Sequence, residues 1–199
     1  MRFVLLQIGV LSLTLTGCMG TIFMPPYQST VDDRPESNYS YVLESVTVQN
    51  TLYESEAVAL DGEQQFLLKP KPEEWLEEAI EAEFEMAGLT RGSTGPKVKV
   101  VVEQFFAEEV TNWPLFFVTI DQASILRLKI SVLSNDGITQ YDRRFIGHFE
   151  DINQIRWIYP IFLMSRNQEL SDILVMATRK ALTDAATGTR ELFDEGLVQ

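Results

Sequence analysis

The chain has 199 residues, one cysteine, one histidine and a formal net charge of -13 at pH 7. Such an acidic surface repels nucleic-acid phosphates and anionic lipid headgroups, which argues against nucleic-acid binding but is compatible with a basic protein partner. A single cysteine allows no disulfide within the chain, and the length suffices for one domain with a substantial core.

Residues 1–17 predict a secretory signal peptide, because Arg2 precedes a short apolar run that ends near Leu13. The stretch Leu15-Thr16-Gly17-Cys18 resembles a bacterial lipobox. This resemblance implies cleavage before Cys18 and attachment of palmitate and other acyl chains to its thiol and new amino terminus. The alternative is an ordinary cleaved signal followed by a chance cysteine.

The apolar run is shorter than the roughly 20 residues of a membrane-spanning helix, so we expect a membrane anchor made of lipid alone. Met19, rather than Asp, follows the cysteine. In the lipoproteins that the lipobox resembles, this implies the outer membrane, on its periplasmic face.

Residues 18–40 predict a lipidated cysteine and a flexible tether, because prolines and polar residues dominate and no apolar period is sustained. The periplasmic domain is expected over residues 41–199. It opens with a strand over 41–50, whose Val42, Val46 and Val48 would share one face.

Two segments predict helices. Residues 73–87 carry an apolar stripe and precede Gly88, which is placed to end the helix in the left-handed conformation. Residues 167–187 repeat apolar side chains at helical spacing, and Gly188 is expected to break this second helix.

Three further strands are expected over 97–105, 119–133 and 138–149, each with alternating apolar and polar residues. Asn135-Asp136-Gly137 predicts a hairpin turn between the last two. The order β-α-β-β-β-α predicts an α/β (α+β) two-layer sandwich. In it, a mainly antiparallel four-stranded sheet has two helices on one face and water on the other.

The order and spacing of these segments resemble the YajG-type lipoproteins of Gram-negative bacteria. The resemblance rests on the lipobox, on Val46-Thr47-Val48, on Met86-Ala87-Gly88-Leu89, on Val98 to Glu103 and on Phe145-Ile146-Gly147. More distantly, the layout is similar to periplasmic lipoproteins with the fold of the TolB N-terminal domain, such as PelC and PqiC. The family implies an α/β domain at the outer membrane and no catalytic residue.

Two aromatic-rich segments, which follow the second strand and the fourth, are expected at the same end of the sheet. We call this group the aromatic end; its residues are Trp113, Leu115, Phe116, Phe117, Trp157, Tyr159 and Phe162. An exposed apolar surface of this size would mark a partner or ligand site. Two alternatives stay open: the segments pack on each other and extend the core, or they enter the membrane interface.

Two other features have simpler explanations. The helix over 73–87 carries seven glutamates and no lysine, which suits a solvated face or, alternatively, a docking face or a weak cation site. His148 is expected opposite Phe145 and Phe149, near Glu150. Without a second histidine or a nucleophile motif, it predicts no catalysis.

The sequence therefore predicts a binding or assembly accessory without enzymatic activity, cofactor or metal. Its expected partners are the membrane, through the acyl chains, and an envelope protein or a second copy of the chain. The alternative is an accessory of lipid or polysaccharide transport with an apolar ligand pocket.

Overall fold

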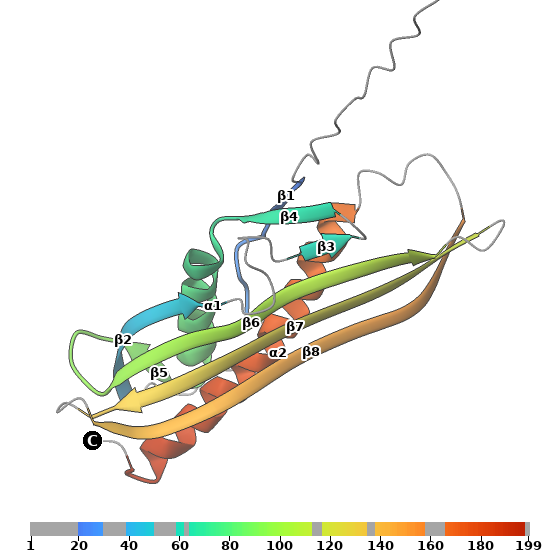
Figure 1. The fold of residues 1–199 in the computed structure, drawn as a ribbon. Helices are drawn as coiled ribbons and strands as arrows, with labels where there is room; N and C mark the ends of the chain where they lie inside the picture. Colours follow the sequence, from blue (N-terminus) through green and yellow to red (C-terminus); the bar gives the residue numbers. More distant parts are fainter. Residues whose placement is uncertain are drawn as a thin grey trace, which may run out of the picture.

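The computed structural model describes residues 20–29, 39–49, 59–61, 64–112, 117–134, 138–157 and 166–197. The described chain forms one sheet of eight strands and two helices (Figure 1). The strands are β1 Gly20–Phe23, β2 Tyr39–Val48, β3 Ala59–Asp61, β4 Gln64–Lys69, β5 Leu89–Arg91, β6 Lys97–Asn112, β7 Phe117–Leu133 and β8 Thr139–Trp157, and the helices are α1 Pro72–Met86 and α2 Arg166–Asp194.

Strand β6 is the centre of the sheet. Along one side it pairs with β7 in antiparallel fashion, and β7 pairs with β8 in the same way. Along the other side it pairs in parallel with β2 over Lys97–Val102 and with β3 over Ala107–Glu109. Strand β4 is antiparallel to β3, and β1 lies parallel to β4.

The α+β class is confirmed, but the expected four-stranded, mainly antiparallel sheet is wrong. The sheet is mixed, and the order of elements is ββββαββββα rather than β-α-β-β-β-α. Strands β1, β3, β4 and β5 have between three and six residues, too few to show a periodic pattern. Each of them pairs in parallel with a strand distant in the sequence. Nothing local in the sequence specifies such pairing.

The three expected strands of the hairpin region are present and longer than predicted. The register of β7 and β8, with Leu133 opposite Thr139, confirms the hairpin. Its turn, Asn135-Asp136-Gly137, lies outside the described residues. Figure 1 shows β6, β7 and β8 as three long, curved neighbours with α2 running along them.

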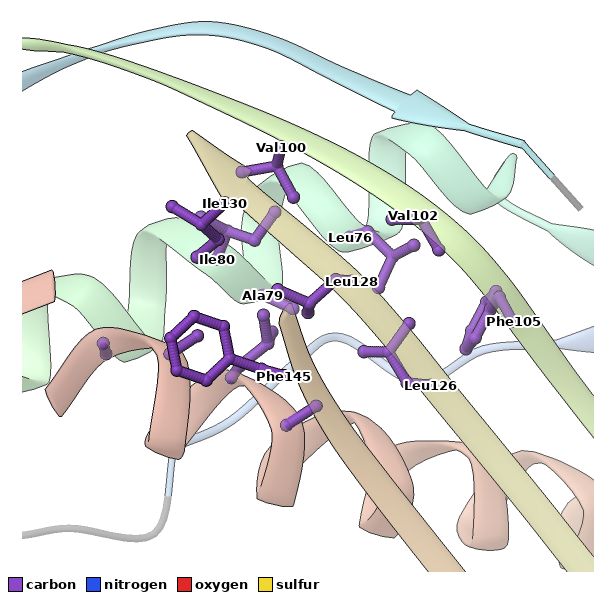
Figure 2. Packing of buried hydrophobic residues seen from close by; sticks show 14 of the residues in the cluster. Leu76, Ala79, Ile80, Val100, Val102, Phe105, Leu126, Leu128, Ile130 and Phe145 are labelled. Atoms are coloured by element: carbon purple, nitrogen blue, oxygen red, sulfur yellow. The ribbon is translucent and has the colours of Figure 1, made fainter. Parts of the chain in front are cut away.

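The buried face of these strands forms the core with both helices. Alternate residues of β6 and β7 are fully buried, whereas Lys99, Arg127 and Lys129 lie on the wet face, as expected. Figure 2 shows Val100, Val102, Leu126, Leu128 and Ile130 of the strands packed beside Leu76, Ala79 and Ile80 of α1. The apolar stripe of α1 is thus confirmed, and Gly88 ends that helix with φ 78°.

Strand β2 departs from its predicted face. Tyr41 and Leu43 are buried, while Val42 is only half-buried. The register between β2 and β6 shifts between Leu43 and Ser45, so β2 has one extra residue there. This extra residue turns Val46 and Val48 to the face that packs against the core.

Helix α2 does not end before Gly188; it continues to Asp194. Tertiary contacts support the added turns: Leu192 and Phe193 are buried, and the guanidinium of Arg190 donates to the carbonyl oxygen of Ala87 at 3.0 Å. These contacts outweigh the cost of about 1 kcal/mol for a glycine inside a helix.

The chain before the predicted domain also differs from expectation. Residues 20–29 do not form a flexible tether: β1 pairs with β4, and Ile22 and Met24 belong to the core. The indole of Trp75 donates to the carbonyl oxygen of Pro25 at 2.8 Å. Residues 1–19 lie outside the described residues, so the signal peptide and the lipidation of Cys18 stay predictions.

Candidate functional site

The strand register brings the two aromatic segments to one end of the sheet. Phe117, the first residue of β7, stands directly opposite Trp157, the last residue of β8. On the other side of β7, Asn112 closes β6 opposite Thr119. The segment that joins β6 to β7 and the segment that follows β8 therefore both start from this end, as the predicted pair of hairpins requires.

The structure describes only part of the aromatic end. Phe117 and Trp157 are placed by their strands. Five members lie outside the described residues, namely Trp113, Leu115, Phe116, Tyr159 and Phe162. The role of the aromatic end in binding stays a prediction, and so does the choice between an exposed and a packed arrangement.

Charge is distributed unevenly along the three long strands. At the end of the sheet near Phe117 and Trp157, the last residues of β6 (110–112), the first of β7 (117–120) and the last of β8 (152–157) contain no acidic residue. Arg156 is the single charged residue among them. One step back, Glu109 of β6 and Asp151 of β8 both stand opposite Gln122 of β7. These two acidic positions border an end of the sheet whose strand residues carry no acidic group.

The wet face away from this end is held by ion pairs between strands. The guanidinium Nε of Arg144 on β8 contacts both carboxylate oxygens of Glu103 on β6, at 2.8 and 3.0 Å. Between them, Lys129 of β7 contacts Asp142 at 2.8 Å. Solvent screens exposed pairs of this kind, so they contribute little to stability, and their positions indicate an ordinary solvated face.

His148 lies where the sequence predicts it, on the exposed face of β8. Its Nε2 is 3.2 Å from a carboxylate oxygen of Glu150, and the side chain is 40% exposed. Within the described residues, no group of three or more metal-binding side chains comes together. The pairing gives His148 a structural partner on a solvated surface.

The glutamate-rich face of α1 is divided in a way that the sequence did not reveal. Arg91 of β5 contacts Glu77 at 2.8 Å and Glu81 at 3.3 Å, which balances part of the exposed charge. Glu83, by contrast, is 3% exposed. Its position three residues after Ile80 adjoins the apolar stripe, and this spacing is the signal that would have found it.

The buried carboxylate of Glu83 joins three segments of the chain. One oxygen accepts a hydrogen bond of 2.8 Å from the Tyr27 hydroxyl, and the other accepts one of 2.9 Å from the hydroxyl of Thr183 on α2. Arg179 of α2 also donates to the backbone carbonyl of Gln28 at 3.1 Å. Burial raises the pKa of the Tyr27 phenol well above its ordinary value, and the nearby carboxylate raises it further. This cluster fixes the N-terminal segment on the helices.

In the part of the chain that the structure describes, neither helix is both long enough and apolar enough to cross a bilayer.

Comparison with known proteins gives a fold but no family. No protein-family model matches the chain, and no curated protein matches its sequence. A solved structure from Xanthomonas campestris, in the family DUF330, superposes with a TM-score of 0.53 at 11% identity. That match covers 88% of this chain and 96% of the other.

Two further structures are more distant. A neuraminyllactose-binding haemagglutinin homologue from Helicobacter pylori has a TM-score of 0.43 at 8% identity, covering 86% of this chain and 96% of its own. A minor lipoprotein from Acinetobacter baumannii has a TM-score of 0.38 at 9% identity, covering 79% and 96%. The chain thus shares the α+β fold of the DUF330 protein, while its resemblance to YajG-type lipoproteins stays a prediction.

Proposed function

We propose that this chain is a lipoprotein anchored in the outer membrane, on the periplasmic face, and that it acts as a non-catalytic binding and assembly accessory. Its anchor would be the acylated Cys18, and its binding surface the aromatic end. The observation that supports this most directly is the pairing of Phe117 with Trp157, because it gathers two aromatic segments at one place.

The anchor is tested in the native host. The wild-type protein should incorporate labelled palmitate and sediment with outer membranes. Replacing Cys18 by Ser removes the only thiol of the chain and should release the protein into the soluble periplasm. A wild-type protein that stays soluble, with residues 1–17 uncleaved, would overturn the proposal.

The binding surface is tested by placing a photo-reactive amino acid at Phe117 or at Trp157. Both should crosslink to a component of the envelope in intact cells. The matched control is Ile146, which is 49% exposed on the wet face of β8, away from the aromatic end. Equal crosslinking from all three positions would contradict a localised surface. Phospholipid or glycan that co-purifies in stoichiometric amount would instead favour the transport accessory.

A further inference from the structure

We infer that the end of the sheet formed by Asn112, Phe117 and Trp157 faces the bilayer that holds the anchor, and that it enters the lipid interface. The inference rests on the proposed acylation of Cys18, and it names the lipid surface as what these strand ends contact. It follows from the direction of β1, from the distances along the sheet and from the charges of the strand ends.

The direction in which the chain enters the sheet is set by four strands. Because β3 is parallel to β6, β4 antiparallel to β3 and β1 parallel to β4, β1 runs opposite to β6. Strand β6 runs toward Asn112. Moving upstream from Gly20 therefore means moving toward the same end of the sheet, and Cys18 is the second residue upstream. Figure 1 shows β1 and β4 together along one edge of the sheet.

The register of the strands gives the distances along the sheet between Gly20 and its two ends. One row across the sheet joins Gly20 to Phe66, Ala59 and Ala107. Asn112 lies five residues beyond this row, about 17 Å at the usual rise of a strand. The opposite end, where Lys97 pairs with Leu133, lies ten residues away on the other side, about 33 Å.

Two residues of chain span at most about 7 Å. An acylated Cys18 at the headgroups would therefore hold Gly20 close to the membrane surface. The hairpin end of β7 and β8 lies too far away to reach that surface first. When the connection from Gly20 to Cys18 is fully extended toward this end, Asn112 lies about 10 Å past the anchor, and sheet twist shortens this distance. This agrees with the 5–10 Å to which apolar surfaces enter the interface.

The chemistry of the strand ends suits lipid. In a chain of net charge -13, residues 110–112, 117–120 and 152–157 carry no acidic group. They include Phe117, Trp157 and several β-branched residues, and aromatic rings favour the boundary between headgroups and hydrocarbon. Asp121 stands opposite Val110 at the border of this end, and Glu109 and Asp151 stand in the next row, opposite Gln122; this border is where we place the water.

The test measures depth in the membrane with nitroxide labels on the acylated full-length protein, reconstituted in phosphatidylcholine vesicles. Because Cys18 is acylated, an added cysteine is the single free thiol. The substitutions are Thr119→Cys and Asn112→Cys at the aromatic end, Ile138→Cys at the hairpin end and Phe23→Cys on β1. Ile138 and Phe23 are 66% and 71% exposed, so labels there should not disturb the fold.

Labels at 119 and 112 should lie about 5–10 Å below the phosphates, and the label at 138 should be fully in water. Labels at 119 and 112 in water, on protein whose mass shows three acyl chains, would overturn the inference and leave the proposed anchor intact. A label at position 23 that lies deeper in the membrane than the labels at 119 and 112 would also overturn the inference, because the β1 edge of the sheet would then face the bilayer. Absence of acyl mass would overturn the proposed function itself.

Discussion

Gly147 of β8 lies against Ala177 of α2 so closely that no side chain fits between them. A Cβ atom at Gly147 would overlap the carbonyl oxygen of Ala177 and approach the backbone nitrogen of Ala181 to 2.7 Å. Ala177 and Ala181 are themselves buried. The helix thus rests on the strand through three small residues, and their sizes set the distance between the two layers of the fold.

Gly147→Ala should lower the free energy of unfolding by about 3 kcal/mol or more, because backbone rather than a flexible side chain must move to admit the methyl group. The matched control is Gly188→Ala within α2, where the new methyl would lie 3.3 Å from the Phe145 ring. There the gain in helix propensity offsets the crowding, and the change should stay within about 1 kcal/mol. Urea titration followed by circular dichroism measures both, and equal losses would contradict the close packing.

The elements with a long local period were predictable from sequence. Helix α1 and the hairpin of β7 and β8 show their buried residues at regular spacing, and short-range contacts suffice to form them. The mixed sheet was not predictable, because β1 pairs with β4, and β3 with β6, between segments that lie far apart in the sequence. Their short sequences hold no pattern that would distinguish strand from loop.

Two single residues illustrate why other features were missed. In the sequence, Glu83 resembles the exposed glutamates around it. In the structure it is buried, because Tyr27 and Thr183 from distant segments donate hydrogen bonds to its carboxylate. Gly188 predicts the end of a helix, but α2 continues through it and the Phe145 ring packs against it. For Phe117 and Trp157, topology alone predicted the shared end of the sheet, since two hairpins return the chain to the same end whatever the exact register is.

Tyr27→Phe should lower the free energy of unfolding by about 1.5–3 kcal/mol, because it removes a hydrogen bond to a buried carboxylate. Tyr41→Phe is the matched control. Its hydroxyl is buried without a hydrogen-bond partner among the described residues. Removing that group should leave stability unchanged or raise it by up to about 1 kcal/mol. Fluorescence of Trp75, whose ring centroid lies 5.6 Å from that of Tyr27, reports the unfolding of this region. Similar losses of unfolding free energy in both variants would contradict a specific role for the hydrogen bond from Tyr27 to Glu83.

Stability should fall as the pH rises above about 10. Burial raises the pKa of both Tyr27 and Tyr41 above the ordinary value near 10. Above that pH the unfolded chain loses phenolic protons that the folded chain keeps, so the unfolded state binds fewer protons and becomes favoured. Below pH 10 the two phenols contribute no slope.

Urea midpoints measured from about pH 8 to 11 test this alkaline dependence. The wild type should lose stability across the upper part of the range, and the double variant Tyr27→Phe/Tyr41→Phe should lose less. A double variant that declines as steeply as the wild type would assign the alkaline loss to other groups.

Inserting a Gly-Ser linker of about 12 residues between Met19 and Gly20 should separate attachment from orientation. Such a linker has a root-mean-square span of about 20 Å, which is enough for the domain to move away from the headgroups. Acylation and sedimentation with membranes should not change, because both depend on Cys18. The nitroxide at position 119 should shift toward water, since Gly20 would no longer be held within about 7 Å of the anchor. A two-residue insertion is the control and should shift it little. If the label stays as deep with the long linker, the aromatic residues themselves, rather than the short connection to Cys18, hold this end in the membrane.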